Sequence, residues 1–232
     1  MMREAIILAG GRGTRLQSVV ADVPKPMAPV AGKPFLCYLF EQLAAANFSR
    51  IVLSVGYKHE VIQGYFGNSY KGMEISYAIE SEPLGTGGGL RLAMKLCKQE
   101  HVFVLNGDTF FDLDFDQFQR VHSENKGGVT LGLKHIKNTT RYGMVALKEN
   151  KIAAFTEKSE EPKSGYINGG IYLVPGQAFL NTTELGVFSF ETAFLQKQSL
   201  PLYGFISEGY FIDIGIPEDY ETANHYFTSS TD

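Results

Sequence analysis

The most informative segment of the chain lies near its N-terminus and reads Glu4-Ala5-Ile6-Ile7-Leu8-Ala9-Gly10-Gly11-Arg12-Gly13-Thr14-Arg15-Leu16. The continuous apolar run Glu4–Ala9 predicts a buried strand. Three glycines follow at once, so successive backbone N–H groups can turn around an anion. Arg12 and Arg15 add charged donors that suit phosphate oxygens. The segment therefore predicts a phosphate-binding loop at a strand's carboxyl end, with a tight turn and two solvated arginines as the alternative.

Two well-known phosphate loops do not fit this segment. The Gly-Lys-Ser/Thr sequence of a Walker loop is absent. Leu16 stands where the dinucleotide pattern Gly-x-Gly-x-x-Gly requires its last glycine.

Strand and helix patterns alternate through the first half of the chain. We expect strands over 4–9, 50–56, 73–79 and 101–105, and helices over 34–48, 58–66, 87–98 and 115–123. The second half is richer in strands, over 128–135, 143–147, 151–157, 166–174 and 202–206, with helices over 189–198 and 217–227. The predicted fold is α/β, with a Rossmann-like mixed, mostly parallel central sheet and helices on both faces. No repeat or linker divides the 232 residues, so we expect a single domain.

Composition excludes several classes of protein. Hydrophobic residues make up 44% and charged residues 20% of the chain, which argues against general disorder. No run approaches the roughly 20 apolar residues of a membrane span. The net charge of −4, without a basic patch, argues against nucleic acid as a partner. Cys37 and Cys97 are expected to be free thiols in a cytoplasmic protein, with one disulfide as the less favoured alternative.

Two acidic residues follow apolar strands. Asp108 closes the run His101–Leu105 within Asn106-Gly107-Asp108, and Asp213 follows Tyr210-Phe211-Ile212. Acids at the carboxyl ends of strands in such sheets face the ligand cleft and suit Mg²⁺. A helix-capping role for Asp108 and a turn role for Asp213 are the alternatives. Lys25 lies between two prolines, which predicts a stiff, extended segment that projects its ammonium group towards phosphates.

The chain resembles the sugar-1-phosphate nucleotidyltransferases. The resemblance rests on Leu8–Leu16 and on motifs that follow in the family's order: Val23-Pro24-Lys25-Pro26-Met27, Glu82-Pro83-Leu84-Gly85-Thr86-Gly87-Gly88, Asn106-Gly107-Asp108, Phe155-Thr156-Glu157-Lys158, Asn168-Gly169-Gly170 and Phe211-Ile212-Asp213-Ile214-Gly215. It runs from about Arg3 to Tyr226. It implies transfer of a nucleotidyl group from a nucleoside triphosphate to a sugar 1-phosphate, with release of pyrophosphate. It also implies a nucleotide-binding half over about 1–125 and a sugar-phosphate-binding half over about 126–227.

The resemblance also implies roles for individual residues. The implied catalytic residues are Arg15, Lys25 and Asp108, and the implied Mg²⁺ ligands are Asp108 and Asp213. The implied nucleotide-binding residues are Leu8, Ala9, Gly10, Gly11, Arg12, Gly13, Thr14, Glu80, Gly85 and Thr86. The implied sugar-phosphate-binding residues are Gly143, Glu157, Lys158 and Asn168. Phe211 departs from many relatives, which have tryptophan there.

The base preference depends on an acidic side chain. A carboxylate at Glu80 can accept two hydrogen bonds from guanine, whereas uracil and thymine offer one donor flanked by acceptors. This favours GTP, although Glu82 competes for the role. Within the family the chain most resembles enzymes that act on D-glycero-D-manno-heptose 1-phosphate.

Several alternatives stay open at this stage. They are a guanylyltransferase for mannose 1-phosphate or another hexose, a uridylyltransferase for N-acetylmuramate 1-phosphate, and a non-enzymatic, nucleotide-sugar-binding regulatory subunit. The chain could also form a homo-oligomer, which its sequence does not decide.

Overall fold

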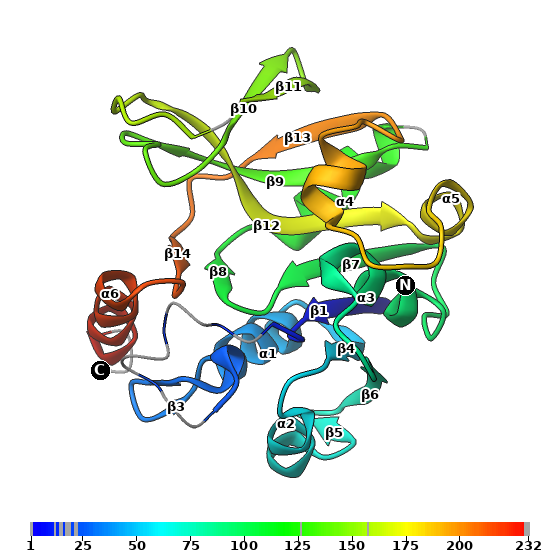
Figure 1. Cartoon of the computed structure of the whole chain (residues 1–232), viewed down its shortest axis with the longest axis vertical. Helices are drawn as coiled ribbons and strands as arrows, with labels where there is room; N and C mark the ends of the chain where they lie inside the picture. The colour runs from blue at the N-terminus through cyan, green and yellow to red at the C-terminus, as the bar shows by residue number, and fades with distance from the viewer. Residues whose placement is uncertain are drawn as a thin grey trace.

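The computed structural model describes residues 2–11, 13, 16, 20, 23–125, 127–156 and 158–229. In this part of the chain a ten-stranded mixed sheet runs through the middle of the molecule, in the order β10-β11-β13-β9-β12-β7-β1-β4-β6-β5 (Figure 1). Strands β1, β4, β6 and β7 are mutually parallel, and β12 joins them through antiparallel pairing with β7. The predicted α/β fold with a mixed sheet is confirmed.

The strands of this sheet are β1 Arg3–Leu8, β4 Phe48–Val55, β5 Ser69–Tyr70, β6 Met73–Ile79, β7 His101–Asn106, β9 Val129–Ile136, β10 Met144–Lys148, β11 Lys151–Thr156, β12 Gly165–Pro175 and β13 Leu202–Ile206. Two small antiparallel pairs lie outside it, β2 Pro29–Val30 with β3 Lys33–Pro34, and β8 Thr109–Phe111 with β14 Phe211–Asp213. The helices are α1 Phe35–Ala45, α2 His59–Phe66, α3 Gly85–Met94, α4 Phe115–Glu124, α5 Gly176–Thr182 and α6 Pro217–Ser229.

The segments η3 and η2 have other helical geometry. The π-helix η3 spans Glu191–Leu195, where we expected a longer helix over 189–198. The 3-10 turn η2 spans Lys25–Met27, so the expectation of an extended segment around Lys25 was wrong. Pro24 is extended, but Pro26 lies in the first turn, where a helix tolerates proline because that N–H has no partner to lose.

The sheet has a hydrophobic core on each face. Side chains of β1 alternate between the two: Ala5 and Ile7 pack in the core that includes α1, and Ile6 packs in the core that includes Leu90 of α3. The continuous apolar sequence of β1 follows from this double burial. Cys37 is buried in α1, Cys97 is half-buried beyond α3, and both are free.

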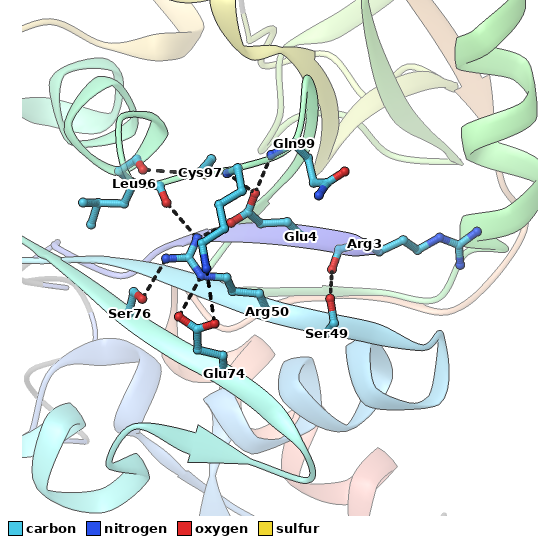
Figure 2. A network of polar contacts seen from close by, with 11 residues as sticks. Arg3, Glu4, Ser49, Arg50, Glu74, Ser76, Leu96, Cys97 and Gln99 are labelled. Carbon is cyan, nitrogen blue, oxygen red and sulfur yellow. Dashed lines mark hydrogen bonds and ion pairs between the residues drawn. The ribbon is translucent and has the colours of Figure 1, made fainter. Parts of the chain in front are cut away.

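A network of polar contacts ties the amino ends of the strands together (Figure 2). Arg50 of β4 pairs with Glu4 of β1 and with Glu74 of β6. The second oxygen of Glu4 accepts hydrogen bonds from the backbone N–H groups of Lys98 and Gln99, at 2.7 and 3.0 Å. The segment that follows α3 is thereby anchored to the sheet.

None of the helices in the described residues is long and apolar enough to cross a membrane.

Candidate active site

The carboxyl ends of β1, β4, β6 and β7 form one wall of a cavity of about 700 Å³. Leu8 at the end of β1 is in register with Ser54 of β4 on one side and with Asn106 of β7 on the other. Parallel strands end at the same edge of a sheet, so the loops that follow them converge there. The predicted residues that line this cavity are Leu8, Ala9, Gly10, Gly11, Gly13, Lys25, Glu80, Gly85, Thr86 and Asp108.

Three predicted nucleotide-site residues, Arg12, Thr14 and Arg15, lie outside the described residues, and so does Glu157 on the sugar side. The glycine loop itself passes close to other groups. A side chain on Gly13, which has φ +60°, would lie 2.6 Å from Cβ of Lys25. Glycine at this position therefore allows the stem of Lys25 to pack against the loop.

Lys25 lies between the two predicted metal-binding aspartates. Its Nζ is 2.5 Å from Oδ2 of Asp108 and 3.6 Å from Oδ1 of Asp213, and its side chain is 10% exposed. Oδ1 of Asp213 also accepts a hydrogen bond of 2.6 Å from the backbone N–H of Gly215. Burial raises the pKa of the Asp213 carboxyl, and the neighbouring Asp108 raises it further, while Lys25 and the Gly215 N–H oppose the shift.

The two aspartates suit a divalent cation shared with phosphate oxygens. Among the residues that the structure describes, no group of three or more His, Cys, Asp or Glu side chains is arranged to hold a metal. Mg²⁺ commonly binds one or two carboxylates and takes its other ligands from phosphates and water. The donor set of Asp108 and Asp213 therefore fits Mg²⁺.

Glu80 borders the cavity just beyond β6. Its Oε2 accepts a hydrogen bond of 2.9 Å from the N–H of Leu84, and its Oε1 lies 3.3 Å from Oγ of Ser54. The carboxylate thus holds the turn that precedes α3, and each oxygen keeps capacity to accept another donor. A Cβ on Gly89 would lie 2.4 Å from Oε1 of Glu80, so a glycine of α3 makes room for this side chain.

Helix α3 begins at Gly85, two residues before the predicted start. The N–H of Gly87 near its start is not free, because it donates to the carbonyl of Phe188 at 2.9 Å. The hydroxyl of Thr86 donates to Glu191 at 2.8 Å and accepts from the N–H of Phe190 at 2.9 Å. A close approach by the segment around Phe188 thus explains the glycines at the start of this helix.

Sequence reasoning missed several residues of the cavity. Ser54, Gly56 and Tyr57 line it at the end of β4, and the strand-end rule applied to Asp108 could have found them. Glu191 lines it from η3, a segment far along the chain with no sequence signal for this role.

Of the predicted sugar-phosphate residues, the three that the structure describes, Gly143, Lys158 and Asn168, are not among those that line this cavity. Lys158 is exposed after β11, and Gly143 immediately precedes β10. Asn168 on β12 donates a hydrogen bond of 2.7 Å to the hydroxyl of Tyr172, which is buried and also bonds to Asn106. Asn106 does line the cavity, so Tyr172 connects the two predicted halves.

A glycine loop, a lysine and two aspartates lie together at the carboxyl edge of a mixed sheet, an arrangement that suits phosphate groups and a divalent cation. A family model described as nucleotidyl transferase matches residues 4–230. The chain belongs to this family, and the resemblance inferred from the motifs is confirmed.

Several similar proteins are sugar-1-phosphate guanylyltransferases. The chain is 48% identical to the D-glycero-alpha-D-manno-heptose 1-phosphate guanylyltransferase of Aneurinibacillus thermoaerophilus, over 95% of this chain and 96% of that protein. It is 34% identical to the mannose-1-phosphate guanylyltransferase of Mycobacterium tuberculosis, over 94% of this chain and 62% of that protein. The crystal structure of HddC from Yersinia pseudotuberculosis complexed with GMP-PN has a TM-score of 0.87 at 36% identity, covering 97% of this chain and all of that chain.

Proposed function

We propose that this protein is a guanylyltransferase that joins GTP to D-glycero-D-manno-heptose 1-phosphate and releases pyrophosphate, making a nucleotide-sugar for surface-polysaccharide synthesis. The observation that carries the proposal is 48% identity to a heptose 1-phosphate guanylyltransferase, with nearly the full length of both chains matched. The guanine nucleotide in the similar HddC structure supports the choice of base.

In the proposed reaction, an oxygen of the sugar phosphate attacks the α-phosphorus of GTP. The bond from this phosphorus to the bridging oxygen of the β-phosphate breaks, and pyrophosphate leaves. A phosphate monoester has its second pKa near about 6, so the nucleophile is already largely dianionic at neutral pH. The protein therefore has to bring two anions together and hold them in line.

The predicted site residues suit this task. The backbone of Gly10, Gly11 and Gly13 would receive the phosphates of GTP, and Lys25 would supply positive charge near the reacting phosphorus. Asp108 and Asp213 would hold Mg²⁺, which when bound neutralises phosphate charge. Glu80 would accept from the guanine edge, and Lys158 with Asn168, Gly143 and Glu157 would bind the sugar phosphate.

A product assay tests the proposal. The purified protein is incubated with each of four nucleoside triphosphates and with a panel of sugar 1-phosphates, and pyrophosphate release and the nucleotide-sugar are measured. We expect the highest kcat/KM for GTP with the heptose phosphate. Efficient use of mannose 1-phosphate with GTP, and none of the heptose phosphate, would replace the sugar assignment. Absence of pyrophosphate with every pair would reject the reaction.

A further inference from the structure

The position of Lys25 suggests a second role for this residue, in the protein without nucleotide. Its ammonium group is the positive charge closest to both aspartates among the described residues, at 2.5 Å from Asp108 and 3.6 Å from Asp213. Those side chains are 35% and 28% exposed, and that of Lys25 is 10% exposed. A Cβ on Gly215 would lie 3.3 Å from Nζ of Lys25, so the backbone at Gly215 packs close to the ammonium group.

We propose that Lys25 is the resident counter-ion of the metal site, which a divalent cation must displace from Asp108 and Asp213 before the lysine can reach phosphate. The proposal rests on the proposed function only for the nature of that phosphate. It concerns the free protein and adds an exchange step to the phosphate-binding role that the resemblance implies.

The argument for exchange is one of space and charge. Oδ2 of Asp108 accepts from Lys25 at 2.5 Å, and a Mg²⁺ ion bound to the same carboxylate would place two cations within a few ångströms of each other. Two carboxylates with one ammonium carry a net charge of −1, whereas the same carboxylates alone carry −2. A divalent cation is therefore attracted more strongly when the ammonium is absent.

The exchange would also couple metal binding to the movement of the Lys25 ammonium group towards the phosphates. Lys25 lines the same cavity as Gly10, Gly11 and Gly13, so an ammonium group released from the aspartates is already beside the predicted phosphate loop. Its stem is held against Gly13, which limits the movement to the end of the side chain. The ammonium group would be released to the phosphate loop when the divalent cation binds, and would pair with the two carboxylates in the metal-free protein.

The test measures binding of Mn²⁺ alone to the free protein, by electron paramagnetic resonance, at low ionic strength and without nucleotide or sugar. Lys25→Met should tighten Mn²⁺ binding at least tenfold, although it removes a residue needed for turnover. Lys25→Arg keeps the charge and should bind Mn²⁺ as the wild type does. Asp213→Asn should weaken binding at least tenfold, which assigns the measured ion to this site.

Lys33→Met is the matched control, because Lys33 is also a partly exposed lysine, paired with Glu41 at 2.6 Å, and does not line the cavity. It should leave Mn²⁺ affinity unchanged. Far-UV circular dichroism establishes that each variant is folded. Unchanged or weaker Mn²⁺ binding in Lys25→Met, or equal tightening in Lys25→Arg, would overturn the proposal.

A second measurement follows the lysine itself in the wild-type protein. Acetylation by acetic anhydride, read by mass spectrometry with Lys33 as reference, should become faster at Lys25 when Mn²⁺ is added. An unchanged rate at Lys25 with Mn²⁺ bound would also refute the exchange. Neither measurement needs turnover, so a protein without guanylyltransferase activity could still show the exchange, and an active one could fail to show it.

Discussion

Replacing Glu4 by glutamine should strongly destabilise the protein without touching the active site. The Glu4 side chain is 2% exposed and faces the guanidinium of Arg50 through one oxygen. Its other oxygen accepts from the N–H groups of Lys98 and Gln99. A glutamine can present one oxygen and one NH₂ group, so either the two N–H donors or the guanidinium must face another donor.

The size of the effect follows from burial. Removing one partner of a buried ion pair typically costs about 3–5 kcal/mol. Arg50 keeps Glu74 as a partner, so the penalty here comes from the buried amide of the glutamine, which must turn its NH₂ group towards another donor. For a chain of this size each kcal/mol lowers Tm by about 2–4 °C, so a fall of roughly 6–20 °C is expected. Glu74 offers a matched control, because it pairs with the same Arg50 but its side chain is 54% exposed. Glu74→Gln should change the free energy of unfolding much less than Glu4→Gln does, because solvent screens an exposed pair.

Urea unfolding followed by far-UV circular dichroism measures both variants. Tryptophan fluorescence is not an option, because the chain has no tryptophan. The reasoning is refuted if Glu4→Gln and Glu74→Gln have equal effects, or if Glu4→Gln costs less than about 1 kcal/mol.

Three further predictions concern other parts of the molecule. Burial, with a smaller effect of His101, lowers the pKa of His122 to about 4 from the ordinary 6.5. As pH falls, the imidazole of His122 therefore takes up a proton in the unfolded chain before it does so in the folded protein. The free energy of unfolding should fall by about 2 kcal/mol between pH 7 and pH 5. Urea titrations of the wild type should show this loss, and those of His122→Gln should not. Arg141 and Asp219 form a two-bond ion pair, at 2.8 and 2.5 Å, that joins the segment before Gly143 to α6. Arg141→Met, Asp219→Asn and the double variant should each raise KM for the sugar phosphate about tenfold, and additive effects would contradict a shared role. Glu80→Gln should narrow the preference for GTP over UTP by about ten- to hundredfold in kcat/KM, and the same result from Glu82→Gln instead would assign the base contact to Glu82.

Strong local patterns predicted the central strands and the cavity edge. Strands β6 and β13 have the predicted bounds, because each is a short apolar or alternating run between turn residues. Asp108 could be placed because it directly follows the buried strand β7, and parallel strands end together. Asp114 directly precedes α4, where an aspartate is a favoured cap, and accepts from the N–H of Gln117 at 2.9 Å.

Elements that depend on distant partners could not be predicted. Strand β8 pairs with β14, about a hundred residues further along the chain, and no local sequence pattern predicts such a pair. Helix α5 begins with Gly176 directly after Pro175, and of its seven residues only Gly176 and Phe179 are buried, so the apolar signal for a helix is short and weak. Glu4 looked like an ordinary acidic residue at a strand's start, because the sequence does not show that Arg50 and two N–H groups converge on it.

These contacts divide the active-site region into fixed and exchangeable parts. Beyond the C-terminal end of α3, Arg50 also donates to the carbonyl of Leu96 at 2.7 Å, while Glu4 accepts from the N–H groups of Lys98 and Gln99. At the other end Gly87 bonds to the carbonyl of Phe188, so the helix that borders the cavity is held at both ends by backbone groups. Lys25, Asp108 and Asp213 are held differently, by contacts between charged side chains whose partners a metal ion and a triphosphate can replace. Because the frame is fixed in this way, substrate binding can be expected to rearrange ionic side chains rather than the sheet, and variants of Glu4 should change stability while variants of Lys25 change metal binding.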